Sequence, residues 1–164
     1  MARTLAVVFL VMAGCRTAGF QDGVFAKPGV RYALTPPSEG WKPVAVEGND
    51  LAWFSTSSDH SLAVDSTCSQ GEDAPLEVLT NHLLMGFTER QRLSQEKEPL
   101  DGRESLHSLY TAKMDGVPVE LELVVLKKDG CVYDFVYVSP PGRAAEKHAA
   151  FDALVRGFKT ESTP

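Results

Sequence analysis

The sequence has 164 residues and a mass of 17.8 kDa, with 43% hydrophobic and 23% charged residues, which is typical of one globular domain and excludes a collagenous or disordered chain. Sixteen Lys and Arg against 22 Asp and Glu give a formal net charge of −6, the wrong sign for a protein that neutralises phosphates. We therefore expect neither nucleic acid nor an anionic membrane surface as a partner.

Residues 1–14 have the features of a secretory signal peptide. Arg3 supplies a positive charge, an apolar run extends from Leu5 to Met12, and two small residues precede Cys15. The run is about half of the ~20 apolar residues that a membrane-spanning helix needs, so an uncleaved transmembrane anchor is the weaker interpretation.

The sequence Met12-Ala13-Gly14-Cys15 resembles the lipobox of bacterial lipoproteins, although leucine is the usual residue where Met12 stands. The resemblance implies that Cys15 is lipidated and becomes the first residue, so that acyl chains hold the protein on a membrane. Arg16 follows the cysteine in place of the aspartate that retains lipoproteins at the inner membrane, which favours the outer membrane, facing the periplasm. A plain signal peptide before an incidental cysteine is the alternative.

Residues 15–30 combine this cysteine with Gly, Pro and small polar residues, without helical or strand periodicity. Such a composition predicts a flexible tether, followed by a single globular domain over 31–159 and a short tail over 160–164. Docking of Phe20 and Phe25 onto the domain or the bilayer interface is the alternative.

Three short strands and one helix are expected in the first half of the domain. The strand candidates lie at 31–34, 51–55 and 61–66. Pro75 suits the first turn of a helix, and Gly86 is a suitable terminator. Apolar residues recur between them at helical spacing: Leu76, Leu79, Leu83, Leu84 and Phe87.

Asp-Gly pairs at 101–102, 115–116 and 129–130 recur every fourteen residues. Asp-Gly is a leading two-residue hairpin turn, because both central positions need φ > 0. The segments between the pairs alternate as strands do. We therefore predict a four-stranded antiparallel meander, with Met114 opposite Val117 across the second turn.

The predicted register also pairs Lys128 with Cys131 across the third turn. It places a set of apolar residues on one face of the sheet, and we expect this face to be buried. Its members are Leu106, Tyr110, Ala112, Met114, Val117, Val119, Leu121, Leu123, Val125, Val132, Val136 and Val138. The other face is partly apolar too, so the sheet is expected to be covered on both sides. Glu120 and Glu122 are most simply a solvated part of that second face.

A second amphipathic helix is predicted after Pro140-Pro141-Gly142. Its apolar residues recur every three or four positions: Ala144, His148, Phe151, Val155 and Phe158. The fold class is therefore α+β: an antiparallel sheet, made of the C-terminal meander and N-terminal strands, with helices packed on it.

This order of elements resembles the PsbP-like fold, an α/β/α sandwich, over residues 31–159. The features that carry the resemblance are Pro37, Gly40-Trp41, the strand Leu51-Ala52-Trp53-Phe54, one helix, the long meander and a last helix that ends at Phe158-Lys159. Proteins with this fold mostly bind and assemble, so the resemblance implies a binding or accessory role. It transfers no functional residue.

Cys68 and Cys131 remain as an even pair once Cys15 is lipidated, and the default in an oxidising compartment is a disulfide. Two separate thiols are the alternative. A second alternative is that one of the cysteines is a catalytic nucleophile, with a base among His60, His82, His107 and His148. No family signature surrounds either cysteine. The four histidines are too dispersed for zinc-site spacing, and His148 lies on the apolar face of its helix as a packing residue. We therefore expect no catalytic residue, no metal and no cofactor.

Asp134 falls on the predicted buried face, between Val132 and Val136. A buried carboxylate needs partners or a raised pKa, which makes Asp134 a candidate site residue. A bulge that turns it outward, or a structural pair with Lys127 or Arg103, is the plainer explanation. Trp41 and Trp53 are expected to fill the core rather than to line a ligand groove.

The sequence thus favours a membrane-anchored envelope lipoprotein that is not an enzyme. In the first hypothesis it is an accessory component that binds another envelope protein, in an assembly for secretion, motility or surface maintenance. The alternatives are a periplasmic module that binds a small molecule or lipid, and an unrecognised hydrolase. A hollow with convergent polar groups favours ligand binding, whereas a flat apolar patch favours a protein partner. The sequence does not specify an oligomeric state.

Overall fold

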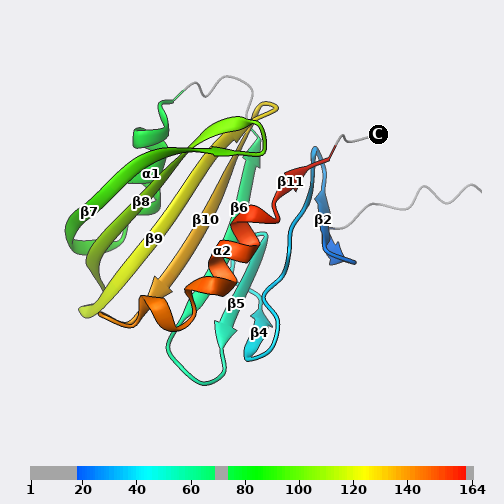
Figure 1. Cartoon of the computed structure of the whole chain (residues 1–164). Coiled ribbons are helices and arrows are strands. Elements are labelled where there is room, and N and C mark those ends of the chain that lie inside the picture. The colour runs from blue at the N-terminus through cyan, green and yellow to red at the C-terminus, as the bar shows by residue number, and fades with distance from the viewer. Residues whose placement is uncertain (1–17, 69–73, 162–164) are drawn as a thin grey trace, which may run out of the picture.

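A computed structural model describes residues 18–68 and 74–161 of the chain, and Figure 1 shows its architecture. Two antiparallel sheets and two α-helices make up the fold, which confirms the predicted α+β class. The main sheet has seven strands in the order β4-β5-β6-β10-β9-β8-β7, and a small sheet has four, in the order β1-β2-β3-β11. None of the helices in the described ranges is long and apolar enough to cross a membrane.

The C-terminal meander forms as predicted. Its strands are β7 (Phe87–Leu100), β8 (Arg103–Met114), β9 (Val117–Lys128) and β10 (Cys131–Ser139). The first residue of each Asp-Gly pair has a positive φ, between 46° and 53°, as the hairpin turn requires. Met114 pairs with Val117 and Lys128 pairs with Cys131, so the predicted register is correct.

Three further strands extend the main sheet beyond β10. They are β6 (Ser61–Cys68), β5 (Leu51–Ser55) and β4 (Trp41–Val44). Each pairs antiparallel with its neighbour, and β4 forms one edge of the sheet while β7 forms the other. The strands expected at 51–55 and 61–66 are thus present, and the side chain of Trp53 is buried in the core as expected.

The predicted tether over 15–30 is wrong for residues 19–30, because these residues fold into the small sheet. Its strands are β1 (Gly19–Gln21), β2 (Val24–Lys27), β3 (Val30–Ala33) and β11 (Lys159–Thr160). Phe25 and Val30 are almost fully buried, and the Phe25 ring lies 5.1 Å from that of Tyr32. The glycines of this segment mark hairpin turns such as Asp22-Gly23, not disorder. The domain therefore extends from residue 19 to residue 160.

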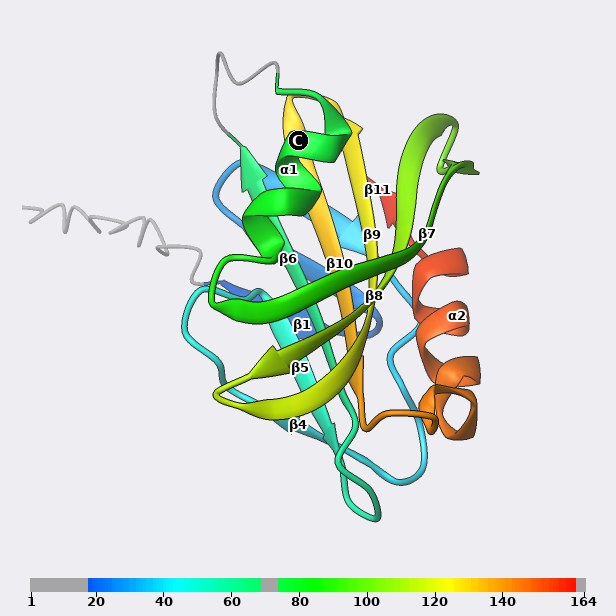
Figure 2. The same ribbon diagram turned by 90° about the vertical axis from the view of Figure 1, so that its left-hand side faces the viewer.

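The two helices cover opposite faces of the main sheet, as Figure 2 shows. Helix α1 (Leu76–Leu83) follows Pro75 and packs on β8 and β9. Helix α2 (His148–Arg156), preceded by the short 3-10 helix η1 (Ala144–Glu146), lies on the other face. The small sheet shares the α2 face, since Phe20 contacts Trp53. The core therefore has two parts, one on each side of the main sheet.

The burial of the predicted apolar face departs from expectation at its ends. Met114 and Val117 are 44% and 60% exposed, because the β8–β9 turn projects beyond the α1 contact. Within β10 the opposite face is the more buried one, since Tyr133, Phe135 and Tyr137 pack in the part of the core beneath α2.

Candidate functional site

Two adjoining clefts lie between α2 and the main sheet, with volumes of about 310 and 370 Å³. Both are lined by His107, Glu122 and His148, so they form one groove with a polar centre, which we call the α2 groove. The first cleft is also lined by Glu98, Ser105, Asp152 and Arg156, so only the second cleft is largely apolar. The apolar residues are Leu100, Val124, Phe151 and Val155 in the first cleft, and Leu93, Leu109, Tyr137, Ala144 and Ala145 in the second.

Glu122 is the central residue of the groove. It lies on β9, its side chain is only 8% exposed, and one of its oxygens, Oε1, contacts two imidazoles. His107 Nε2, from β8, lies 2.7 Å from this oxygen, and His148 Nε2, from the first residue of α2, lies 3.0 Å from it. The other ring nitrogen of His107 lies 3.4 Å from Glu98 on β7. Three strands and a helix therefore bring these four side chains together.

The hydrogen bond between Glu122 and His107 shifts the pKa values of the two groups in opposite directions. The hydrogen bond to Glu122 raises the pKa of His107 above its ordinary value, against the opposing effect of burial. Burial alone would raise the pKa of Glu122, but the hydrogen bonds to His107 and His148 outweigh it and hold that pKa below its ordinary value. The cluster thus favours a negative carboxylate beside a positive imidazole.

The sequence-based interpretation of Glu122 was wrong, because α2 covers that part of the sheet and the side chain does not lie on a solvated face. His148 packs against the rings of Tyr137 and Phe151, as a packing residue does, but its side chain is also 45% exposed and Nε2 contacts a carboxylate. The histidines are dispersed in sequence, but two of the four meet at Glu122. Nothing in the sequence spacing indicates this contact, which depends on where α2 crosses the sheet.

The chemistry that this cluster offers is hydrogen bonding and a mobile proton. In the described ranges both imidazoles of the groove contact carboxylates rather than a hydroxyl or thiol. No group of three or more His, Cys, Asp or Glu within residues 18–68 and 74–161 is arranged to hold a metal ion. His60 is fully buried elsewhere and bonds Ser58 and the Arg143 carbonyl.

Cys68 and Cys131 are joined by a disulfide at directly opposed positions of β6 and β10. Their Cα atoms lie 4.1 Å apart, so the 63-residue separation in sequence is closed at one end of the sheet. A cysteine nucleophile needs a free thiolate, and the bond removes both of these thiols from that role. Cys15 lies outside the described residues, and its lipidation stays a prediction.

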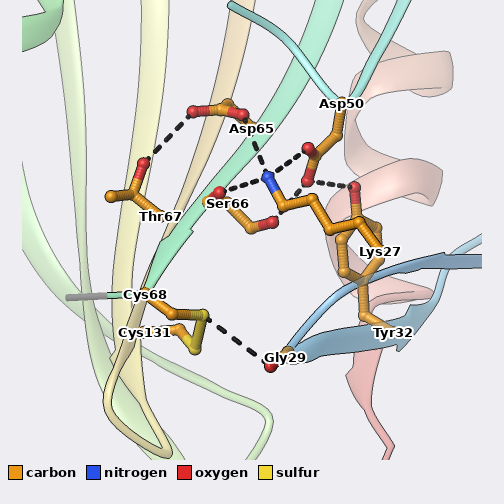
Figure 3. A network of polar contacts seen from close by, with 9 residues as sticks. All are labelled: Lys27, Gly29, Tyr32, Asp50, Asp65, Ser66, Thr67, Cys68 and Cys131. Carbon is orange, nitrogen blue, oxygen red and sulfur yellow. Dashed lines mark hydrogen bonds and ion pairs between the residues drawn. A yellow bond between two sulfur atoms is a disulfide. The ribbon is translucent and has the colours of Figure 1, made fainter. Parts of the chain in front are cut away.

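A buried polar network beside this disulfide joins the two sheets, as Figure 3 shows. The Lys27 ammonium on β2 lies 2.5 Å from Asp50 Oδ1 and donates to the Ser66 carbonyl at 2.6 Å. The Tyr32 hydroxyl donates to Asp50 Oδ2 at 3.1 Å, and the Ser66 hydroxyl donates to the same oxygen. The Asp50 side chain is only 4% exposed. The sequence gives no sign of this network, because its members come from strands of both sheets and from the loop before β5.

Asp134 lies on the α1 face of β10, as predicted, opposite Asp65 on β6 and Val125 on β9. The pairing of β10 is regular, so the bulge interpretation is wrong. Asp134 Oδ1 is buried and, among the described residues, has no hydrogen-bond partner. Burial, with a smaller effect of the Asp65 charge, raises the pKa of Asp134 to about 7. Asp134 therefore lies outside the groove, and burial makes its charged form unfavourable.

Comparison with known proteins finds chains with a similar fold, while the two sequence comparisons find no match. No protein-family model matches the sequence. A search among curated proteins also finds no match. Solved structures do resemble it, and they define its fold as PsbP-like. The cyanobacterial PsbP protein CyanoP of Synechocystis sp. PCC 6803 aligns with a TM-score of 0.53 and 14% identity, over 94% of this chain and 99% of its own.

Two other structures have the same fold. LpqN of Mycobacterium tuberculosis, described as involved in cell envelope biogenesis, aligns with a TM-score of 0.57 and 11% identity, over 80% of this chain and 83% of its own. The Ran-binding protein Mog1p of Saccharomyces cerevisiae aligns with a TM-score of 0.54 and 13% identity, over 79% of this chain and 88% of its own. Because the identities are so low, the likeness bears on fold alone.

Proposed function

We propose that this protein is a non-catalytic component of the bacterial cell envelope, anchored through lipid on Cys15, that binds a small molecule or lipid in the α2 groove. The groove itself carries the proposal. It is concave, has apolar residues in both clefts and convergent polar groups at its centre, which is the usual form of a ligand site. A flat apolar surface, which favours a protein partner, is not what α2 and the sheet form here.

The polar centre of the groove supports binding rather than catalysis. Glu122 and its two imidazoles present both acceptors and donors to a ligand. Such groups orient a ligand whose apolar parts occupy the two clefts. The envelope role of LpqN, which has the same fold, is consistent with this location.

Two matched variants, each with one alanine replaced by tryptophan, test the groove. Ala145 lines the groove, whereas Ala149 lies on the other side of α2, against Thr35 and Trp41, and both are exposed. Ala145→Trp fills the groove and Ala149→Trp does not. We expect native mass spectrometry of the protein purified from its own membranes to show a bound molecule in the unsubstituted chain and in Ala149→Trp, and none in Ala145→Trp.

Two results would contradict groove binding. One is the same bound species in all three proteins. The other is an absence of bound species together with capture of one envelope protein that is lost in Ala145→Trp, which would restore the protein-partner hypothesis.

Lipid anchoring is tested separately at Cys15. The intact mass of the protein from bacterial membranes should exceed that of residues 15–164 by the mass of its acyl chains, and Cys15→Ser should release the protein from membranes or stall its processing. Unchanged mass and unchanged membrane attachment in Cys15→Ser would overturn the anchor.

A further inference from the structure

We propose that the edge of the main sheet formed by β4 and β5 is the surface through which this domain touches the bilayer that holds its lipid anchor. The surface is an apolar patch of Val44, Val46 and Phe54, which we call the β4–β5 patch. The inference rests on the proposed anchor at Cys15 and extends it, because it names the side of the domain that faces the membrane.

The three side chains of the patch are large, apolar and exposed. Val44, Val46 and Phe54 have exposed fractions of 44%, 47% and 45%. Lys42 pairs with Phe54 and Val44 pairs with Ala52, so Val44 and Phe54 are diagonal neighbours on one face of the sheet. Val46 follows two residues later, in the loop 45–50 that leads into β5. The described helices leave this face open, since α1 packs on β8 and β9 and α2 lies on the opposite face.

The chain enters the domain close to this patch. Gly19, the first residue of β1, pairs with Ala26, next to Lys27. The Lys27 ammonium lies 2.5 Å from Asp50, the last residue of the loop that contains Val46. The start of β1 and the loop 45–50 therefore lie on the same side of the molecule, and β1, β4 and β5 are seen together in Figure 2.

The length of chain before β1 limits how far the domain stands from the bilayer. Four residue steps separate Cys15 from Gly19, and a fully extended chain spans ~14 Å over that distance. A lipidated Cys15 therefore holds the β1 side of the domain at the membrane interface. Apolar side chains that are kept there bury their surface among the lipid headgroups and the upper acyl chains.

The charges around the patch favour a neutral bilayer surface over a strongly anionic one. Lys42 on β4 and Glu47 in the loop are both exposed and carry opposite charges. The contact is therefore apolar in origin and depends little on anionic lipid. It also orients the α2 groove, because β8 lies five strands from β4, ~24 Å at the usual strand spacing. The groove then opens away from the membrane.

A chemically anchored chain tests the contact. With the Cys68–Cys131 disulfide intact, Cys15 is the one free thiol of residues 15–164 and couples to a maleimide phosphatidylethanolamine in phosphatidylcholine vesicles. Val46→Trp places a fluorophore in the patch. Val117→Trp is the matched control, because Val117 is 60% exposed at the β8–β9 turn. Trp41 and Trp53 give a background that the unsubstituted chain measures.

We expect the added emission of Val46→Trp to shift to shorter wavelength and to fall about twofold when the vesicles contain brominated phosphatidylcholine, while that of Val117→Trp stays unchanged. The inference is overturned if Val46→Trp is not quenched in protein that floats with the vesicles, or if both tryptophans are quenched equally. Since the anchor is attached chemically, this result does not depend on acylation in cells, which the intact mass tests by itself.

Discussion

Two buried carboxylates, both on the α2 side of the main sheet, have different hydrogen-bond partners, one beside the small sheet and the other beside α2. Asp50 accepts hydrogen bonds from an ammonium, a phenol and a serine hydroxyl. Glu122 contacts two imidazoles, the one side chain type whose charge ordinarily changes near neutral pH. Asp50 is sealed between two sheets, whereas Glu122 lies at the wall of an open groove.

This difference separates a structural group from a candidate binding group. The donors to Asp50 join the N-terminal strands to the main sheet. The partners of Glu122 leave its surroundings adjustable, which is useful to a ligand and unnecessary for the fold. Three predictions test whether these two carboxylates behave in this way, and how they differ from Asp134 on the α1 face, whose Oδ1 has no hydrogen-bond partner among the described residues.

The largest effect is expected for Asp50→Asn. The substitution removes the negative charge and leaves the partly buried Lys27 ammonium without its nearest counter-ion. Breaking a buried ion pair from one side costs about 3 to 5 kcal/mol. Urea unfolding should therefore show a free energy of unfolding lower by about that amount.

The control is Asp22→Asn, since Asp22 is an exposed turn residue on the same small sheet with a positive φ that asparagine accepts. Its stability should match that of the unsubstituted chain. A loss below about 1 kcal/mol in Asp50→Asn would mean that the network does not join the sheets.

The main sheet was the most predictable part of the fold. Asp-Gly turns fix the register of neighbouring strands by local chemistry, so Met114 and Val117 were paired correctly from sequence. Of the small sheet only β3 was predicted, as the strand at 31–34, because β11 arrives from the far end of the chain to pair with it. Without that partner, residues 19–30 have only short strands and turn residues, which is also the composition of a linker.

The second prediction concerns Asp134. Its buried Oδ1 has no hydrogen-bond partner among the described residues, so neither a fixed donor nor an imidazole compensates for its burial. Burial raises its pKa from an ordinary 3.8 to about 7. A raised folded-state pKa means that stability is complete below the unfolded value and is lost as pH rises through the folded one. The difference corresponds to at most roughly 4 kcal/mol above pH 7. Asp134→Asn should remove this pH dependence, so that its stability relative to the unsubstituted chain rises between pH 4 and pH 8.

Thermal unfolding at pH 4, 6 and 8 checks this, with Asp115→Asn as the control because Asp115 lies in an exposed turn. Parallel curves for the Asp134→Asn protein and the unsubstituted chain across this range would show that Asp134 is paired in solution and carries no burial cost.

The candidate site was less predictable than the fold. Asp134 was placed on the correct face because strand alternation alone decides it. The Glu122 cluster was missed for a different reason. Alternation assigns Glu122 to a face but does not reveal that α2 covers this face, and the contact of His148 with Glu122 depends on the crossing of a helix over a sheet.

The smallest effect is expected at Glu122, and it is confined to a narrow pH range. The pKa of Glu122 is lowered, so its contribution is present above pH ~4.5 and is lost as pH falls through the folded value. The pKa of His107 is raised, so its contribution is present below pH ~6.5 and is lost as pH rises through the folded value. Both contributions to stability are complete only between about pH 4.5 and 6.5. Glu122→Gln should therefore reduce stability by about 1 to 2 kcal/mol within that range and by less above it.

The direct readout of this prediction is the NMR titration of the His107 ring. In Glu122→Gln its pKa should fall toward the ordinary value, because the hydrogen bond to the carboxylate is the main cause of the increase. In the neighbouring variant Glu120→Gln it should not move, since Glu120 contacts the Gly142 amide instead. If Glu120→Gln lowers the His107 pKa as much as Glu122→Gln does, the imidazole responds to the general negative charge of the sheet. The contrast between a fixed carboxylate at Asp50 and an adjustable one at Glu122 would then lose its structural basis.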